Sequence, residues 1–333
     1  MAIYGNKRKG EFKMEVNCIS RNFFSLGTVN SIKIYNSDEK ELLERAVTRV
    51  NEIDDLMSAY KADSDVSILN RNSGKGFVDI HPDTFKVLNR SIEFSQMSSG
   101  AFDITIRPMV ELWGIGKKKN FIPCEDEINK IKKLVNYKGV LLDKSSCRAC
   151  LEIPGQAIDL GGIAKGFAAD EVKRILIEGN VENALINLGG NIVTIGNRPD
   201  GRPCQIGIQN PLEATGSHLG ILAVTDKTIV TSGCNERFFI KDGIRYHHIL
   251  DPRTGMPVKT TALSITAVAE CSMDADALTT ALFVLENGFR GDGLDLVRRF
   301  CAEVIIINSD GEVLITDGLK ESFKVRSRCY EKE

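Results

Sequence analysis

The sequence predicts an α+β fold with mixed or largely antiparallel sheets, and three patterns carry this prediction. Apolar residues recur at helical spacing in several segments of the chain. Short runs rich in β-branched residues dominate the second half, with helices interspersed but without strict strand–helix alternation. Two Asp-Gly pairs stand between such runs, a signal typical of hairpin turns. A doubly wound parallel sheet is therefore not expected.

The length and net charge of the chain limit the classes of function that it can have. The chain has 333 residues, enough for one large or two modest domains, and we expect a single domain over residues 20–320 after a flexible extension at 1–19. The net charge of −2 offers no basic excess for binding nucleic acid. The sequence contains no run of 18 apolar residues, the length that would indicate a membrane span, so no stable membrane insertion is expected.

Two further observations favour the cytoplasm. The first residues carry charges but no apolar stretch behind them, so they do not form a secretory signal peptide. The nine cysteines are odd in number and scattered. Cys147 and Cys150 form a lone C-x-x-C with no second pair at zinc-site spacing, so we interpret the cysteines as free thiols of a reducing compartment.

The first half of the chain contains most of the expected helices. A strand around Ser31–Tyr35 precedes a helix that runs from Leu42 to Met57 and that Asp38 can cap. Two more helices are expected, over about Asp83–Met97 and about Asp126–Val135.

The second half begins with an amphipathic helix over Ile163–Leu176 that ends near Gly179. Another helix is expected over Met273–Leu285. The expected strands are Ala184–Leu188, Ile192–Ile195, Gln205–Gln209, Gly220–Val224, Thr228–Thr231, Arg237–Ile240, Ile244–Leu250, Leu263–Val268, Glu303–Asn308 and Val313–Thr316. Hairpin turns are expected at Asp242-Gly243 and Asp310-Gly311.

Two glycine-rich turns are candidates for phosphate binding. The run Ile158–Phe167 places glycines and Lys165 where the chain enters a helix, so backbone N–H groups and a positive charge can approach a phosphate. A tight turn with a surface lysine explains the run equally well, and it matches neither a Walker A loop nor G-x-G-x-x-G. The run Leu185–Asn191 ends a strand in two glycines, and a purely structural turn is its simpler explanation.

Polar residues cluster again after residue 230. Thr231 and Ser232 end one strand, and His247 and His248 lie on another. Because side chains alternate along a strand, only one of these two histidines can easily point into a given site. Asp251 precedes Pro-Arg-Thr-Gly and is equally suited to shaping a turn.

Hard oxygen ligands occur at helical spacing near the C-terminus. Asp276 and Thr280 stand four residues apart, so they share one face of the expected helix. A carboxylate and a hydroxyl suit Mg²⁺, with waters and phosphates completing its coordination. A capping role for the aspartate, with the threonine bonded back to its own helix, is the alternative.

An aromatic segment offers contacts for a ring system. Residues Ser99–Pro108 form a glycine-punctuated run that contains Phe102, and Tyr60 follows the end of the first helix, where it can stack on an aromatic ligand. A buried core segment with a turn is the simpler alternative.

These segments resemble a known family in their order along the chain. The series M-S-x-Y, G-A-F-D-I-T-x-x-P, D-L-G-G-I-A-K-G-F-A-A-D, I-N-L-G-G-N, T-S-G, H-I-L-D-P-R-T-G-x-P and D-A-D-A-L-T-T-A-L is similar to that of the ApbE family, the FAD:protein FMN transferases. The resemblance extends from about Phe24 to Ile315. It implies a T-fold-like α+β architecture, with FAD in a cleft between two intertwined subdomains.

The resemblance also implies the reaction. A Thr or Ser hydroxyl of an acceptor flavoprotein attacks the phosphorus on the FMN side of FAD, with Mg²⁺ bound, and AMP leaves. The metal ligands it implies are Asp276, Thr280 and the backbone carbonyl of Ala164, and His248 is the implied general base. The implied FAD-binding residues are Met57, Tyr60, Ala101, Phe102, Asp103, Asp159, Gly161, Gly162, Lys165, Gly189, Gly190, Thr231, Ser232, His248 and Asp251.

The chain departs from the family pattern in two places. It shows no export signal, and Cys234 and Asn235 follow Thr-Ser-Gly where an acidic and an aromatic residue are common. Two other functions stay open at this point. An FAD pyrophosphatase would use water in place of the acceptor hydroxyl, and a flavin-binding protein would lack turnover.

Overall fold

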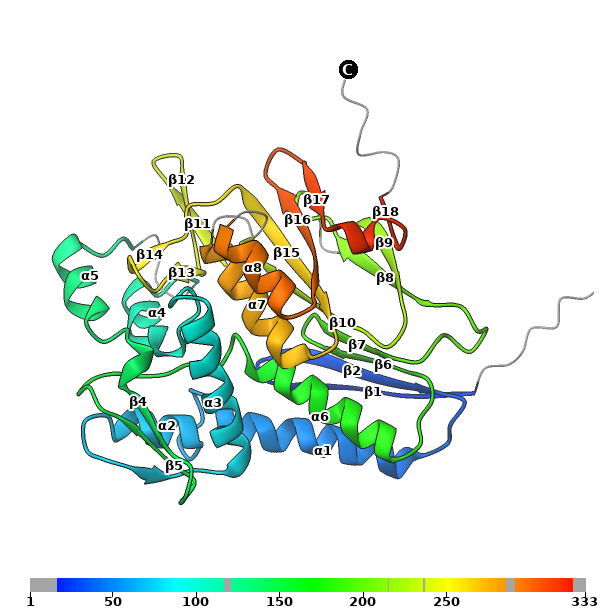
Figure 1. Cartoon of the computed structure of the whole chain (residues 1–333), viewed down its shortest axis with the longest axis horizontal. Coiled ribbons are helices and arrows are strands. Elements are labelled where there is room, and N and C mark those ends of the chain that lie inside the picture. The colour runs from blue at the N-terminus through cyan, green and yellow to red at the C-terminus, as the bar shows by residue number, and fades with distance from the viewer. Residues whose placement is uncertain (1–16, 117–120, 215, 236, 286–290, 326–333) are drawn as a thin grey trace, which may run out of the picture.

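An antiparallel sheet of eight strands forms the centre of the protein (Figure 1). The computed structural model describes residues 17–116, 121–214, 216–235, 237–285 and 291–325. In order across the sheet, the strands are β1 (Cys18–Ser25), β2 (Thr28–Tyr35), β6 (Ala184–Leu188), β7 (Asn191–Ile195), β10 (Thr228–Gly233), β15 (Ala262–Ala269), β16 (Glu303–Asn308) and β17 (Val313–Ile315).

Smaller sheets complete the β structure, and each is antiparallel. One three-stranded sheet consists of β18 (Phe323–Val325), β9 (His218–Val224) and β8 (Cys204–Gln209), and the other of β3 (Val78–Asp79), β5 (Arg148–Leu151) and β4 (Val140–Asp143). The two-stranded sheets are β11 (Phe238–Lys241) with β12 (Ile244–His247), and β13 (Leu250–Asp251) with β14 (Met256–Pro257).

Helices cover one face of the central sheet, with α1, α6 and α7 lying across it (Figure 1). The α-helices are α1 (Lys40–Met57), α2 (Asp65–Arg71), α3 (Pro82–Met97), α4 (Arg107–Trp113), α5 (Glu125–Lys132), α6 (Ala164–Glu178), α7 (Ser272–Val284) and α8 (Gly291–Arg299), and the short 3₁₀ turns are η1 (Ile104–Ile106), η2 (Tyr137–Gly139) and η3 (Asp317–Leu319).

Both faces of the central sheet are buried along β15 and β16. Ile229 packs with β8 and β9, whereas its neighbour Val230 packs with the helices, because successive side chains of a strand point to opposite faces. A third, smaller core joins Met109 and Trp113 of α4 to Ile128 of α5. Strand β10 therefore lies in the interior of the molecule, and its C-terminal end can carry a site held from both sides.

The predicted elements are largely confirmed. Strands β6 and β16 have the predicted bounds, α6 and α7 begin one residue from their predicted starts, and the hairpins at Asp242-Gly243 and Asp310-Gly311 both form. The cap prediction is wrong. Glu39 is the N-cap of α1, because the Asp38 carboxylate instead accepts a hydrogen bond of 2.6 Å from Asn17.

A second correction concerns the strand expected over Ile244–Leu250. The structure divides it into β12 and β13, because the imidazole of His247 turns inward and binds the carbonyl of Val258. The predicted flexible extension falls mostly at residues 1–16, which lie outside the described residues, and β1 begins at Cys18.

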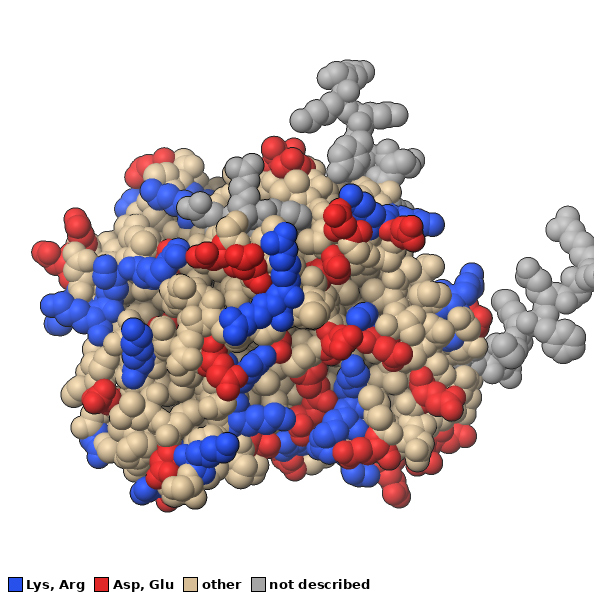
Figure 2. Space-filling model, viewed as in Figure 1, with Lys and Arg blue, Asp and Glu red and all other residues tan. Residues whose placement is uncertain are grey.

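The surface carries no large region of one charge on the face shown in Figure 2, where basic and acidic side chains are intermixed. Within the described ranges, no helix is both long enough and apolar enough to cross a bilayer.

Candidate active site

The centre of the candidate site is Asp276, which projects from α7 toward the first turn of α6. Its side chain is only 3% exposed. The backbone N–H of Gly166 donates to Asp276 Oδ2 at 3.0 Å, and Lys165 Nζ lies 3.3 Å from Oδ1 and 3.4 Å from Oδ2. The carboxylate is therefore held in place beside a positive charge and the N-terminal end of a helix.

Glycine permits this close approach of the two helices. A Cβ atom at Gly166 would lie 2.2 Å from the carbonyl oxygen of Ser272, so no larger residue fits there. At Gly162 a Cβ would lie 3.3 Å from the ring of Phe102 and 3.4 Å from Thr280 Oγ1. Three separately predicted residues, Phe102, Gly162 and Thr280, are thus neighbours in space.

The end of β10 adjoins the same helix. Ser232 Oγ and Thr279 Oγ1 are 2.8 Å apart, which places Ser232 one residue from Thr280 on α7. Thr231 points to the other face of the sheet, where its hydroxyl lies 2.8 Å from that of Thr266. Its predicted contact with FAD therefore requires a ligand that reaches around the end of the strand.

The second glycine pair lies next to β10. Strand β7 begins at Asn191 opposite Val230, so the turn at Gly189 and Gly190 stands beside the end of β10. Both glycines adopt positive φ, 58° and 97°, and the space around a Cβ at Gly190 is open. A ligand can therefore approach this backbone closely.

The donor set fits a hard divalent cation. Asp276 offers one carboxylate, Thr280 offers a hydroxyl whose bond to the Asp276 carbonyl is long, at 3.4 Å, and Ala164 offers the carbonyl of the first residue of α6. In the part of the chain that the structure describes, no group of three His, Cys, Asp or Glu residues forms a metal cluster. One carboxylate with neutral oxygens is a set suited to Mg²⁺, which keeps waters and binds phosphates.

The two histidines have different partners. In His247, Nε2 lies 2.9 Å from the carbonyl of Val258 and Nδ1 accepts from the N–H of Ile249. Both ring nitrogens are therefore hydrogen-bonded to the backbone. In His248, Nδ1 lies 3.2 Å from the carbonyl of Arg237. A carbonyl only accepts, so Nδ1 carries the proton and Nε2 of His248 is left as the basic nitrogen.

Both imidazoles are neutral at ordinary pH. Burial lowers the pKa of His248 to about 4, and the positive charge of Arg237 adds to this effect. Burial also lowers the pKa of His247 to about 4. A neutral ring is the form that can take a proton, so His248 has the protonation state that a general base needs.

Tyr60 is 68% exposed, and the guanidinium of Arg107 lies 4.8 Å from its ring centroid. Arg107 also pairs with Asp159 at 3.2 Å. Asp159 in turn accepts from the N–H of Gly161, so the aromatic ring and the glycine turn are linked through two side chains. Beside them is a hollow of about 300 Å³, lined by Ala59, Ser67, Asn70, Arg71, Arg107, Glu111 and Ala157.

Four of the predicted FAD-binding residues are buried or bound to other residues of the protein. Met57 and Ala101 are buried, and Met57 belongs to the main core. The buried carboxylate of Asp103 accepts from Thr105 and from the N–H of Tyr137, and the carboxylate of Asp251 is bound by Arg253. Their predicted contacts with FAD remain predictions.

Two residues that the sequence did not single out shape the site. Arg107 joins Tyr60 to Asp159, and Asp170 of α6 accepts from the first N–H groups of α7. Arg107 lies inside a segment already noted for its aromatic residues. Asp170 ends the D-L-G-G-I-A-K-G-F-A-A-D run, yet nothing in its spacing indicates that it reaches a helix a hundred residues away.

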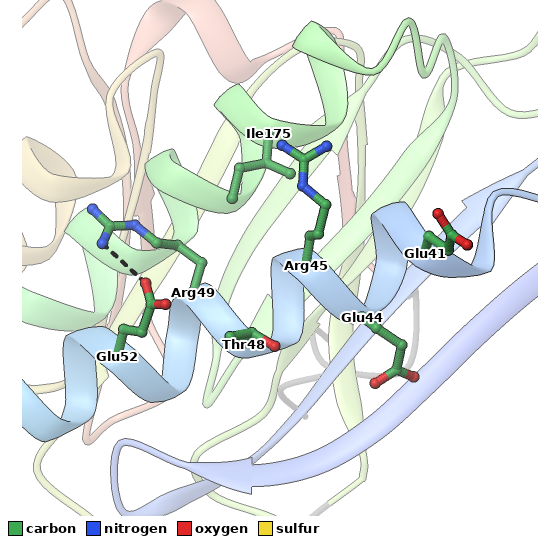
Figure 3. A pocket seen from close by; sticks show the side chains of 7 residues that line it. All are labelled: Glu41, Glu44, Arg45, Thr48, Arg49, Glu52 and Ile175. Carbon is green, nitrogen blue, oxygen red and sulfur yellow. Dashed lines mark hydrogen bonds and ion pairs between the residues drawn. The ribbon is translucent and has the colours of Figure 1, made fainter.

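Another hollow of the described surface lies elsewhere. A groove of about 460 Å³ runs between α1 and α6 and is lined by Glu41, Glu44, Arg45, Thr48, Arg49, Glu52 and Ile175 (Figure 3). Three glutamates and two arginines line it, and Arg49 is bound to Glu52, Asp83 and Glu171. None of the predicted site residues lines this groove.

Comparison with known proteins identifies one family. Residues 26–306 match the ApbE family. An FAD:protein FMN transferase of Klebsiella pneumoniae (strain 342) is 32% identical over 306 residues, covering 92% of this chain and 94% of that protein. One of Treponema pallidum (strain Nichols) is 32% identical over 324 residues, covering 92% and 89%. The flavin transferase ApbE of Vibrio cholerae superposes with a TM-score of 0.82 at 27% identity, covering 92% and 99%.

Proposed function

The chain belongs to the ApbE family and is an FAD:protein FMN transferase, and we propose that it uses Mg²⁺ to join FMN to a Thr or Ser hydroxyl of an acceptor flavoprotein with release of AMP. The observation that supports this mechanism is the meeting of Asp276, Thr280 and Lys165 at the start of α6. Phosphoryl transfer depends mostly on positioning and on neutralising charge, and this cluster is suited to both.

The step itself is a displacement at phosphorus. The acceptor oxygen forms a bond to the phosphorus on the FMN side, the bond to the bridging oxygen breaks, and AMP leaves with that oxygen. His248 Nε2 takes the proton of the attacking hydroxyl. When bound by Asp276, Thr280 and the Ala164 carbonyl, Mg²⁺ neutralises charge on the pyrophosphate oxygens.

Other residues of the chain position the FAD. Lys165 favours binding of the pyrophosphate because it is a cation. The first N–H groups of α6 favour it because they are the positive end of a helix dipole. The backbone at Gly161, Gly162, Gly189 and Gly190 allows the ligand to approach. Tyr60 and Phe102 hold the isoalloxazine ring, and Thr231 and Ser232 lie beside the ribose or pyrophosphate.

A product analysis tests the transfer. The protein is incubated with FAD, MgCl₂ and a candidate acceptor, and the acceptor is then weighed by mass spectrometry while AMP is quantified. We expect the acceptor to gain one FMN for each AMP released. Release of AMP and free FMN, at a rate that is independent of the acceptor, would identify an FAD pyrophosphatase instead.

The place of the flavin ring is tested at Tyr60. We expect Tyr60→Ala to weaken FAD binding by roughly 1–3 kcal/mol, the scale of stacking on an aromatic side chain, and to leave ADP binding nearly unchanged. Fluorescence titration of FAD and calorimetry of ADP measure both affinities. Phe77→Ala is a control, because Phe77 is also an exposed aromatic with an arginine over its ring but lies outside the predicted site. Equal losses for FAD and ADP would place the ring elsewhere.

We further propose a reducing, cytoplasmic location. The eight cysteines of the described residues are all free, as expected where thiols are kept reduced. Titration of the denatured, unreduced protein should therefore find nearly all nine cysteines reactive. Recovery of several disulfide-bonded peptides from freshly isolated protein would rule this location out.

A further inference from the structure

The two helices that carry the metal ligands both begin without a local cap. The N-cap residue of α6 is Ile163 and that of α7 is Cys271, and neither side chain accepts a hydrogen bond from its helix. The first N–H groups of a helix have no partner within it, and leaving them unpaired in a buried place is costly. Their partners must come from elsewhere in the chain.

Each helix supplies that partner to the other. Asp170, in the middle of α6, accepts from the N–H of Ser272 at 2.8 Å through Oδ1 and from the N–H of Met273 at 2.9 Å through Oδ2. In return Asp276 of α7 accepts from the N–H of Gly166 in the first turn of α6. The Cys271 thiol also donates to Asp170, at 3.3 Å. The two carboxylates thus form a reciprocal pair of caps.

This arrangement fixes how α7 is rotated. One carboxylate bound to two successive N–H groups holds the first turn of α7 in a single orientation, and the contact of Gly166 with Ser272 leaves no room for the helices to shift. Asp276 lies one turn beyond Ser272, and Thr280 one turn further. Their direction toward Gly162 and Lys165 therefore depends on how the helix begins.

We infer that Asp170 is a positioning residue for the metal site: it touches neither FAD nor metal, and it holds α7 so that Asp276 and Thr280 present their oxygens together. This inference rests on the proposed function, because it assigns Asp170 a role toward the metal that Asp276 and Thr280 would bind. Partners that orient metal ligands typically change metal affinity 10–100-fold when they are replaced.

The test measures metal binding apart from turnover. Mn²⁺ replaces Mg²⁺, since both prefer oxygen ligands, and free Mn²⁺ is followed by its electron paramagnetic resonance signal. In Asp170→Asn one acceptor oxygen becomes an NH₂ group that faces a backbone N–H. We expect this variant, while folded by circular dichroism, to bind Mn²⁺ about tenfold more weakly than the parent.

Asp274→Asn is the matched control. Asp274 lies in the same first turn of α7 and carries the same charge, but its carboxylate is bound by Arg90 at 2.7 and 2.8 Å. We expect this variant to bind Mn²⁺ within twofold of the parent. Equal weakening of Mn²⁺ binding in both variants would mean that the effect is a general loss of negative charge, and it would overturn the inference. An Mn²⁺ affinity of Asp170→Asn within twofold of the parent would overturn it as well.

Two further measurements separate the remaining outcomes. A parent protein that binds no Mn²⁺ overturns the metal site and this inference together, whereas a binding parent with an unaffected Asp170→Asn overturns the inference alone.

If Asp170→Asn does not fold, Asp170→Glu keeps the charge but displaces both oxygens, and it should weaken Mn²⁺ binding as well. If neither variant folds, the parent decides: amides of Ser272 and Met273 that exchange hydrogen as fast as unprotected peptide overturn the inference, and slow exchange supports it.

Discussion

Replacing Asp276 by asparagine should lower flavin transfer by about 10³-fold or more while the protein remains folded, because the proposed metal site would lose the Asp276 carboxylate and with it several kcal/mol of charge stabilisation. Asparagine keeps an oxygen that can accept from Gly166, so the cap on α6 survives the change. The rate of AMP release from FAD at saturating MgCl₂ measures the effect, and thermal unfolding checks the fold.

Two comparisons make this result interpretable. Asp274→Asn removes a carboxylate from the same helix turn and should retain most of the activity, since its partner is Arg90. Removal of divalent metal from the parent with a chelator should reproduce the loss seen in Asp276→Asn. A variant that turns over like the parent at saturating Mg²⁺ would show that Asp276 is not a metal ligand.

The second large effect is expected at His248. His248→Ala should lower the transfer rate about 10²–10⁴-fold, the usual contribution of a general base, and leave FAD affinity within a few fold. The reason is the neutral ring whose Nδ1 is committed to the Arg237 carbonyl, which leaves Nε2 to take the proton. Single-turnover transfer to an acceptor, together with an FAD titration, separates the two quantities.

His247→Ala serves as the control for this substitution. It removes a buried ring that binds Val258 and Ile249, so we expect a loss of folding stability of about 1–3 kcal/mol with little change in the rate per folded molecule. A rate lost in His247→Ala and kept in His248→Ala would reverse the assignment. If neither substitution lowers the transfer rate, a group other than these histidines takes the proton of the acceptor hydroxyl.

The pH dependence adds an independent check. The pKa of His248 is lowered to about 4, so the base form is present above that value and is lost as the pH falls through it. The transfer rate of the parent should therefore fall near pH 4, not near pH 6.5. His248→Ala should lack this acid limb. A parent rate that halves near pH 6.5 would mean that the ring is not desolvated during catalysis.

Local patterns predicted much of this molecule, because many of its elements obey the periodicity of their own residues. Strand β6 and helix α7 follow directly from apolar spacing. The order of the short motifs indicated the ApbE family and flavin transfer, and the comparisons confirm both. Elements without a strong local signal were missed, among them β1 and the short strands β4 and β5. Strand β3 was missed as well, and its partner β5 is distant in the chain.

The contacts inside the site could not be predicted in the same way. Nothing near Asp170 in the sequence indicates that it caps α7, and nothing near Arg107 indicates that it lies over Tyr60. The cap expected from Asp38 failed because a competing donor, Asn17, lies just before β1, on a segment distant from Asp38 in the sequence. Hydrogen bonds between distant segments are decided by the fold as a whole, and a single sequence does not show them.

The order of strands in the central sheet has a consequence for how the enzyme becomes active. Strand β2 can pair with β6 only after residues 36–183 between them have been synthesised, and the proposed metal ligands Asp276 and Thr280 follow later still. Such distant pairings close long loops and make folding slow. If the proposed site is the true one, a growing chain on the ribosome has no complete site until α7 has emerged, so incomplete chains should not transfer flavin.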